Sequence, residues 1–282
     1  VGESTCCSQS DVEDARQVAF GLGLEHFTFN FTGTFGCEVI DRFCDAYLHG
    51  RTPNPCIDCN RYLKFAALQR RRAQLGFDYV ATGHYARRVF NERTGRFELR
   101  RGLDEAKDQS YVLYHLTQDD LAHMLFPLGE LTKPQVRELA EKHSFGNAHK
   151  AESQDICFVP DGDYASFIAR YMGFGDDAVR DDGKEPTVPA AFEPGNIVDV
   201  CGKVLGRHSG LVHYTIGQRK GIGVAAPEPL YVVGKDAAEN VLVVGPRSEL
   251  GVREVRAGDV NLISVAELDK PLRVTAKTHY RQ

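Results

Sequence analysis

The chain has 282 residues, of which 42% are hydrophobic and 26% charged, and its formal net charge is −5. This balance is typical of a globular protein and excludes a chain that is disordered throughout. No apolar run approaches the roughly 20 residues of a membrane span, and no secretory signal is visible. The length predicts about two domains. Eight cysteines in such a chain are better interpreted as chemistry than as disulfides.

The first 160 residues alternate between helical and strand-like patterns. Helices are predicted over residues 10–22, 39–48 and 63–75, each closed by a nearby glycine. Alternating phenylalanines predict a strand over 27–31, a short buried strand is predicted over 79–81, and a hairpin over 87–101. Two further helices are predicted after Thr117 and Thr132. This alternation favours an α/β domain with a parallel sheet, whose ligands bind beyond the carboxyl ends of the strands.

From about residue 160 the helical periodicity fades and glycine and proline become frequent. Short β-like runs occur at residues 197–200, 211–216, 230–233, 241–244 and 274–277. This pattern predicts a small mixed domain followed by a β-rich domain.

Charge is unevenly distributed along the chain. Residues 61–101 hold eleven basic and three acidic side chains, so this segment carries +8 and the remainder carries −13. All but one of the eleven are arginines, which suit bidentate contact with phosphate. The segment is either a nucleic-acid footprint or a solvated helix face followed by a charged hairpin, and charge alone slightly favours the second interpretation.

The loop of residues 51–60 is rich in proline and cysteine and places Cys59 at the start of the next predicted helix. A helix N-terminus lowers the pKa of a thiol and so favours the nucleophilic thiolate. Cys56 and Cys59 also form a CxxC pair, which is compatible with a structural zinc site, although zinc usually has four ligands. The spacing does not decide between reactive thiols and metal.

Cys157 is flanked by apolar residues, which by itself favours a buried and unreactive cysteine. The other five cysteines are interpreted as structural: Cys6, Cys7, Cys37, Cys44 and Cys201. Two polar segments, residues 107–110 and 214–221, are either ligand contacts or solvated turns. The second contains Arg219 and Lys220, which suit phosphate.

Six segments occur together and in one order, at residues 6–16, 50–60, 81–87, 107–111, 152–163 and 214–223. In this combination the chain resembles the tRNA-specific 2-thiouridylases over essentially its whole length. The resemblance implies ATP-dependent 2-thiolation of the wobble uridine of tRNA, with ATP and Mg²⁺ as cofactors. It also implies a sulfur-relay protein or cysteine desulfurase as persulfide donor, and a cytoplasmic location.

The fold implied by the resemblance has three parts. Residues 1–159 form a Rossmann-like ATP-pyrophosphatase domain, residues 160–226 a small central tRNA-binding domain, and residues 227–282 a partial β-barrel. The chain departs from the family pattern because the Ser-Gly-Gly-x-Asp-Ser loop that cradles pyrophosphate is absent. The first strand–loop–helix unit and the end of the barrel are also expected to be missing. We therefore expect that the 282-residue polypeptide does not adenylate tRNA.

The resemblance also implies roles for single residues. Cys157 carries the persulfide, and Cys59 is the second catalytic thiol, which forms a transient disulfide with Cys157. The implied binding residues are Asn54, Pro55 and Cys56 for the target base, Gly83 for ATP, and His84, Lys107, Asp108, Gln109, His279 and Tyr280 for tRNA. Many family members have aspartate in place of Cys56, so Cys56 either replaces that carboxylate or supplies a third thiolate. No metal ligand is implied.

The implied chemistry is coherent, because adenylation converts the C2 oxygen of uracil into a good leaving group and a persulfide is nucleophilic at neutral pH. The base leaves the anticodon stack to reach these groups. Two alternatives remain open. One is an iron–sulfur or zinc protein with Cys56, Cys59 and Cys157 as ligands. The other is a non-catalytic tRNA-binding protein that lacks the ATP loop.

Overall fold

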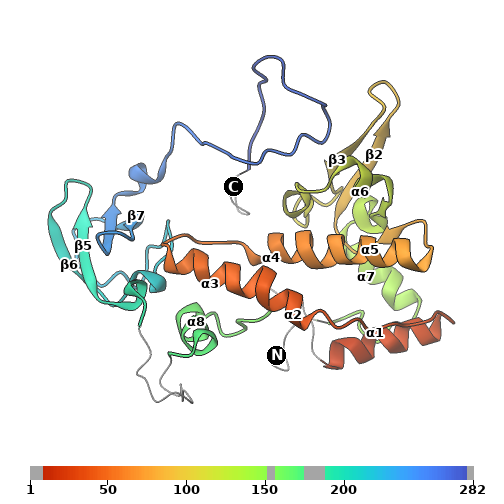
Figure 1. Cartoon of the computed structure of the whole chain (residues 1–282), viewed down its shortest axis with the longest axis horizontal. Coiled ribbons are helices and arrows are strands. Elements are labelled where there is room, and N and C mark those ends of the chain that lie inside the picture. The colour runs from red at the N-terminus through yellow and green to blue at the C-terminus, as the bar shows by residue number, and fades with distance from the viewer. Residues whose placement is uncertain (1–8, 151–155, 175–187, 278–282) are drawn as a thin grey trace. The chain divides into compact units, whose positions relative to one another are not determined.

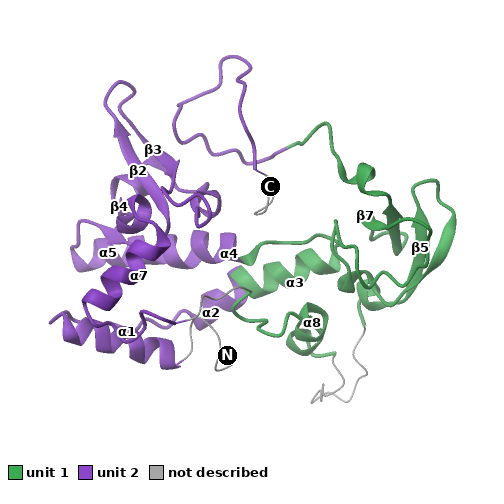
Figure 2. Cartoon of the chain, turned by 180° about the vertical axis from the view of Figure 1, so that it is seen from behind, with its two compact units in different colours: residues 1–5, 39–55, 154–256 green, residues 6–38, 56–153, 257–282 purple. Residues whose placement is uncertain are grey.

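The structure is a computed structural model that describes residues 9–150, 156–174 and 188–277 (Figure 1). Contacts divide the chain into two compact units, each assembled from segments that are distant in sequence (Figure 2). Unit 1 comprises residues 1–5, 39–55 and 154–256, and unit 2 comprises residues 6–38, 56–153 and 257–282. Within the described ranges, no helix is both long and apolar enough to cross a membrane.

A helical segment runs from residue 55 to residue 75, and all of it except Pro55 belongs to unit 2. It consists of α4 (Pro55–Asp58), a π-helical stretch (Cys59–Phe65) and α5 (Ala66–Leu75). The helix ends at Gly76, whose φ of +74° is the left-handed conformation that glycine adopts most easily. The predicted start at residue 63 was too late, because a proline is compatible with the first helical turn, where no N–H is needed.

The N-terminal part of unit 2 agrees with the sequence prediction in one element and not in the next. Helix α1 (Gln9–Gly21) is present, and Gly23 follows it with φ +67°. The predicted strand at residues 27–31 is wrong, because residues 24–31 have no partner strand among the described residues. Alternating phenylalanines alone do not make a strand, since a strand requires a hydrogen-bonded neighbour. The short helix α2 (Thr32–Phe35) follows.

The strands of unit 2 frame the predicted ligand edge. Strand β1 (Val80–Ala81) pairs in parallel with β4 (Met124–Leu125), which confirms the predicted short strand and the parallel pairing. The predicted burial is wrong, because Val80 is half-buried and Tyr79 and Ala81 are exposed. The predicted hairpin is formed by β2 (Ala86–Asn91) and β3 (Arg96–Arg101). The core beneath them consists of Phe65, Ala86, Val112, Leu113, Leu116, Leu121 and Met124.

Two predicted helix starts in unit 2 are confirmed by their caps. Thr117 and Asp120 form a capping box at α6 (Gln118–Ala122), and Thr132 and Gln135 form another at α7 (Lys133–Lys142). Two short 3₁₀ turns lie nearby at Ser110–Leu113 and Pro127–Glu130.

Unit 1 combines helices with a four-stranded sheet. The helices are α3 (Asp41–Leu48), which a π-helical turn (Gly36–Ile40) precedes, and α8 (Tyr164–Met172). The sheet has the order β6-β5-β8-β7, with β5 (Gly195–Asp199), β6 (Val204–His208), β7 (Tyr231–Asp236) and β8 (Val241–Gly245). Strands β5 and β8 are parallel, whereas the two outer pairs are antiparallel. No closed barrel is formed by the described residues.

Two of the predicted β-like runs in the second half are wrong. Residues 211–213 form a 3₁₀ turn, because Leu211 and Val212 enter two different apolar clusters and do not face one sheet. Residues 274–277 have no regular structure. Strand β6 was missed, since Gly206, Arg207 and His208 interrupt its apolar pattern. Two 3₁₀ turns complete unit 1 at Ala190–Phe192 and Arg247–Leu250.

Candidate active site and RNA contacts

The predicted nucleophile region lies on the helix that begins at Pro55. Cys56 is exposed and Cys59 is half-buried, so the two thiols of the CxxC pair differ in access to solvent. The structure corrects the predicted position of Cys59, which lies one turn inside the helix and begins the π-helical stretch. A π-helical turn is rare and often marks a functional position. Of the implied base-binding residues, Asn54 is exposed just before the helix and Pro55 is buried.

The carboxyl end of β1 leads directly into Gly83 and His84, as predicted for a ligand edge. Gly83 is exposed, and a Cβ added there would lie 3.7 Å from Leu128 Cδ1, which is ordinary contact. His84 is only 7% exposed, its Nδ1 lies 3.0 Å from Thr82 Oγ1, and its ring centroid is 5.6 Å from that of Phe65. Burial, assisted by the nearby Lys64 cation, lowers the pKa of His84 to about 4. His84 is therefore a neutral, internal side chain at pH 7.

A second histidine, His115, packs near the same Phe65 ring. Its ring centroid is 5.7 Å from that of Phe65, and burial, followed by the charge of Arg61, lowers its pKa to about 4. Its two ring nitrogens and the Oδ1 atom of Asn60 are buried without a hydrogen-bond partner in the described ranges. Sequence reasoning missed His115, whose only signal is a single histidine within the apolar run 111–116.

Two of the three residues implied for tRNA contact at 107–109 are used within the fold. The Asp108 carboxylate is 6% exposed and accepts hydrogen bonds from the Gly102 and Ser110 backbone N–H groups, both at 3.1 Å. The side-chain oxygen of Gln109 accepts from the Tyr85 backbone N–H at 3.1 Å, and the backbone N–H of Gln109 donates to the Tyr85 carbonyl at 2.9 Å. These contacts hold the segment after β1 in place.

Cys157 belongs to unit 1 and is half-buried. The residues on either side, Ile156 and Phe158, pack against the cluster that contains Phe43 and Ile168. The ring centroids of Phe158 and Phe43 are 5.2 Å apart in an edge-to-face arrangement. Cys157 is thus held by a rigid apolar support. The implied tRNA residues His279 and Tyr280 lie outside the described residues.

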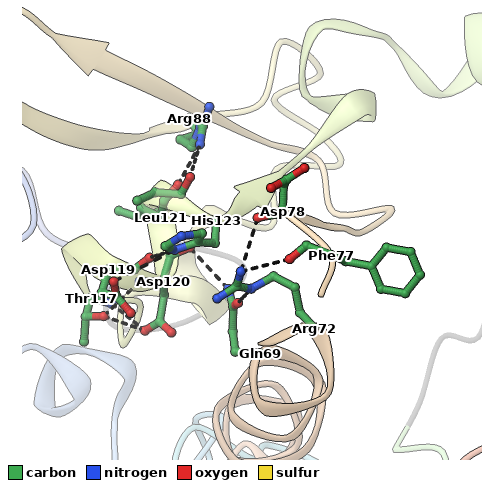
Figure 3. Close-up of polar contacts among 11 residues, drawn as sticks. Gln69, Arg72, Phe77, Asp78, Arg88, Thr117, Asp119, Asp120, Leu121 and His123 are labelled. Carbon is green, nitrogen blue, oxygen red and sulfur yellow. Dashed lines mark hydrogen bonds and ion pairs between the residues drawn. The ribbon is translucent and has the colours of Figure 1, made fainter. Parts of the chain in front are cut away.

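The arginine-rich segment divides into internal and displayed side chains. Arg88 donates to the carbonyl oxygens of Leu121 and Ala122 at 2.8 and 3.1 Å, at the end of α6. Arg72 donates to the carbonyls of Phe77 and Asp78 (Figure 3). The C-terminal end of a helix carries partial negative charge, which explains why Arg88 is stabilised at the end of α6. These arginines brace the fold of unit 2 and are not available for phosphate.

Other arginines of the segment are displayed at the surface. Arg70 and Arg93 are exposed, and neither side chain has a polar partner within the part of the chain that the structure describes. Arg100 is also exposed but pairs with Glu98 at 2.7 Å. The predicted nucleic-acid footprint is therefore reduced to a few side chains.

Metal ligation receives no support from the described part of the chain. Within those ranges, no group of three or more histidine, cysteine, aspartate or glutamate side chains is arranged to hold a metal ion.

The chain matches two family models, described as the tRNA methyl transferase HUP domain over residues 1–161 and the tRNA methyl transferase PRC-barrel domain over residues 188–246. It is 48% identical over 275 residues to the tRNA-specific 2-thiouridylase MnmA of Carboxydothermus hydrogenoformans, covering 98% of this chain and 71% of that protein. The chain belongs to the tRNA-specific 2-thiouridylase family. The relative from Moorella thermoacetica is 47% identical over 280 residues, with 99% of this chain and 74% of that protein covered.

Membership of the 2-thiouridylase family confirms the resemblance and the fold class. A HUP domain is Rossmann-like, and a PRC-barrel domain follows it in the chain. The two-stranded parallel pair β1–β4 belongs to the first region and the four-stranded sheet to the second. The names of the relatives describe thiolation, whereas the descriptions of the family models mention methyl transfer.

Proposed function

We propose that this protein is a tRNA-uridine 2-sulfurtransferase, which performs ATP-dependent 2-thiolation of the wobble uridine. The observation that carries the proposal is the similarity to relatives named tRNA-specific 2-thiouridylase over 98–99% of the chain. The half-buried Cys59 and Cys157 and the position of Gly83 after β1 are consistent with it. In this proposal the protein acts in the cytoplasm, and its three parts are residues 1–159, 160–226 and 227–282.

The proposed reaction has two stages. ATP adenylates the C2 oxygen of the flipped uracil and releases pyrophosphate. The terminal sulfur of a persulfide on Cys157 then attacks C2, and AMP leaves with the oxygen. The Cys59 thiolate attacks the sulfur of Cys157, so that the S–S bond of the persulfide breaks, 2-thiouridine is released and a Cys59–Cys157 disulfide forms. A thiol reductant resets the disulfide, and a sulfur-relay protein or cysteine desulfurase reloads Cys157.

The chain's own residues take distinct parts in this scheme. Asn54, Pro55 and Cys56 receive the target base at the start of the helix that carries Cys59, and Gly83 contacts the nucleotide. His84, Asp108 and Gln109 are internal, so we assign them to holding the segment that follows β1 rather than to gripping RNA. Lys107 remains a proposed tRNA contact. The described residues offer no cluster of three ligands for a metal, and we route no step through Mg²⁺.

The sulfur half of the reaction needs no ATP and tests the proposal directly. Incubation of the 282-residue chain with a cysteine desulfurase and cysteine should place one persulfide on Cys157, detected by mass spectrometry of alkylated peptides. Cys157→Ser should abolish this modification, whereas Cys201→Ser, which changes an exposed cysteine of the same unit, should not. Modification spread equally over the exposed cysteines would contradict the assignment.

The complete reaction also needs the adenylation step, which we expect the 282-residue chain not to perform, so it is assayed with that chain and with the protein as its gene encodes it. With ATP, Mg²⁺, a persulfide donor and tRNA, the protein should form 2-thiouridine at the wobble position, and Cys59→Ser should stop turnover while Cys157 is still loaded. Anaerobic purification followed by metal and sulfide analysis addresses the alternative with Cys56, Cys59 and Cys157 as ligands. Stoichiometric iron or zinc bound by these cysteines would overturn the persulfide proposal. Binding of tRNA without any thiolation would favour the non-catalytic alternative.

A further inference from the structure

A loop of unit 1 is held in one conformation by a single glutamine. We call residues 215–230 the barrel loop. The side chain of Gln218 accepts from the Thr215 N–H at 3.0 Å and donates to the Lys220 carbonyl at 2.9 Å, while its backbone carbonyl accepts from the Val232 N–H of β7 at 2.9 Å. Gly217, Gly221 and Gly223 have φ values of +88°, +76° and +79°, a conformation that other residues rarely adopt. The loop is therefore built and anchored to the sheet.

The barrel loop lines an open cavity of about 500 Å³, and most of the lining residues are exposed. Ile222 is buried on its inner side, and Val224 and Leu230 are half-buried beside it, because all three pack against the apolar core of the sheet. Ala225 and Ala226 also line the cavity and leave it open to solvent. The side chains of Ile222, Val224 and Leu230 form a floor on which a flat ring can pack, and a preformed loop reduces the entropy lost when a ligand binds.

Two cations stand at the rim of this cavity. Arg219 lines it and Lys220 is adjacent, both are exposed, and neither side chain has a polar partner within the part of the chain that the structure describes. Glu228 is the acidic residue on the lining, and its carboxylate suits an N–H or hydroxyl donor. The cations are not paired with Glu228 in this structure, so their charge is directed to solvent.

We propose that the barrel loop is a binding site for one unstacked nucleotide of the tRNA, with Arg219 and Lys220 on the flanking phosphates and the base on the apolar floor. Arginine binds phosphate through its planar fork, and unstacked RNA bases dock on apolar or aromatic surfaces. A protein surface of acidic character would also be attracted to the cations, but it would not need the cavity. This inference rests on the proposed function, because it assumes that tRNA is bound.

The test compares tRNA binding by full-chain variants over a series of salt concentrations. Arg219→Ala combined with Lys220→Ala should weaken binding roughly 10-fold. It should also lower the slope of log affinity against log salt by about 1.4, since each phosphate contact with single-stranded nucleic acid releases about 0.7 of a counterion. The matched control is Lys203→Ala combined with Arg207→Ala, which removes one lysine and one arginine from strand β6 and its preceding turn in the same unit. The control should leave the slope unchanged, and thermal melts should show all variants folded.

A second variant tests the cavity itself. Ala226→Trp fills the cavity without changing charge, so it should weaken tRNA binding several-fold and leave the salt slope at the wild-type value. If this variant binds tRNA as tightly as the wild type, the nucleotide assignment is overturned. If the Lys203/Arg207 control loses as much affinity as the Arg219/Lys220 variant, the location of the site is overturned. Failure of the wild-type chain to bind tRNA would overturn the proposed function instead. If the wild-type chain binds tRNA and the Arg219/Lys220 variant binds with the same affinity and salt slope, only this inference is overturned.

Discussion

The arginine-rich segment and the barrel loop use their cations in opposite ways. In the segment, Arg72 and Arg88 donate to backbone carbonyls, and the fold of unit 2 depends on them. In the barrel loop, the side chains of Arg219 and Lys220 make no polar contact within the described residues. The segment carries +8 and the loop only two adjacent cations with one nearby acid. The density of charge along a sequence therefore does not measure the charge that is available to RNA.

The same division applies to the polar residues that the family resemblance assigns to tRNA. His84 and Asp108 are buried, and Gln109 is bonded to the backbone of Tyr85. Such residues influence binding by holding other groups in place, whereas displayed side chains act by direct contact. We call side chains that are bonded within the fold internal and those exposed at the surface displayed. Substitution of an internal side chain is expected to lower stability, whereas substitution of a displayed one is expected to change binding alone.

The largest effect is expected at Gly129, which supports the arginine-rich hairpin. A Cβ at this position would lie 2.0 Å from the Ala86 carbonyl oxygen, so the backbone of β2 would have to move. Gly129→Ala should cost more than about 4 kcal/mol of unfolding free energy, in the range of severe clashes. Gly146→Ala is the control, because nothing lies within 4 Å of its Cβ position. Similar denaturant midpoints for both variants would contradict the packing.

The free energy of unfolding should decrease at acidic pH because His84 and His115 are buried in their neutral form. The pKa of His84 and that of His115 are each lowered to about 4 in the folded chain, against 6.5 in the unfolded chain. Between these values the unfolded state binds more protons, so stability is complete above pH 6.5 and is lost as the pH falls toward 4. The slope for His84 should approach about 1.4 kcal/mol per pH unit, and that for His115 should be smaller because His115 as a whole is less buried than His84.

Urea unfolding at pH values from 6.5 to 4.5 measures this loss. His115→Phe should flatten the curve, because it removes one proton-binding group and keeps an aromatic ring beside Phe65. His143→Phe is the matched control, because it makes the same substitution at an exposed histidine of the same unit, and its curve gives the reference against which His115→Phe is compared. An unchanged slope in His115→Phe would show that this ring is protonated in the folded chain as easily as in solvent.

Loss of an internal arginine should have an intermediate effect. Arg88→Ala removes two hydrogen bonds to the end of α6 and the contact of the guanidinium with the Phe97 ring, whose centroid is 4.7 Å away. We expect a loss of roughly 2–3 kcal/mol, as for hydrogen bonds to charged groups. Arg93→Ala, at the exposed tip of the same hairpin, should change stability by less than about 0.5 kcal/mol. Equal melting temperatures for the two variants would remove the distinction between internal and displayed arginines.

The sequence predicted local elements well where a chemical signal marks them. Gly76 ends a helix, Thr117 and Thr132 begin two others, and residues 91–95 turn a hairpin, because these residues have specific backbone roles. Residues 27–31 were predicted as a strand from alternating phenylalanines, and residues 211–216 from a short β-like run. Whether such a run becomes a strand depends on a neighbour or on a single core face, and both are tertiary properties.

The sequence motifs predicted which residues lie near the candidate site, but not which of them are buried and hydrogen-bonded within the fold. The motifs located Cys59, Gly83 and His84, and the structure places Gly83 and His84 directly after β1. Burial of His84 and of Asp108 could not be read from the sequence, because it depends on the packing of Phe65 and on the Gly102 backbone. His115 carried no motif at all. The cysteine pair did not reveal that Cys59 lies one turn inside its helix.

The smallest effects should come from the displayed arginines of the segment, and they concern binding alone. Arg70→Ala and Arg93→Ala should each lower the slope of log tRNA affinity against log salt by roughly 0.7–0.9 if the side chain contacts a phosphate. Arg100→Ala is the matched control, because its guanidinium is paired with Glu98 at 2.7 Å and contributes little net charge. A lowered salt slope, measured for variants whose melting temperatures are unchanged, would assign Arg70 and Arg93 to the surface that contacts RNA. A slope change for Arg100→Ala as large as for Arg93→Ala would show that the ion pair with Glu98 does not withhold Arg100 from RNA.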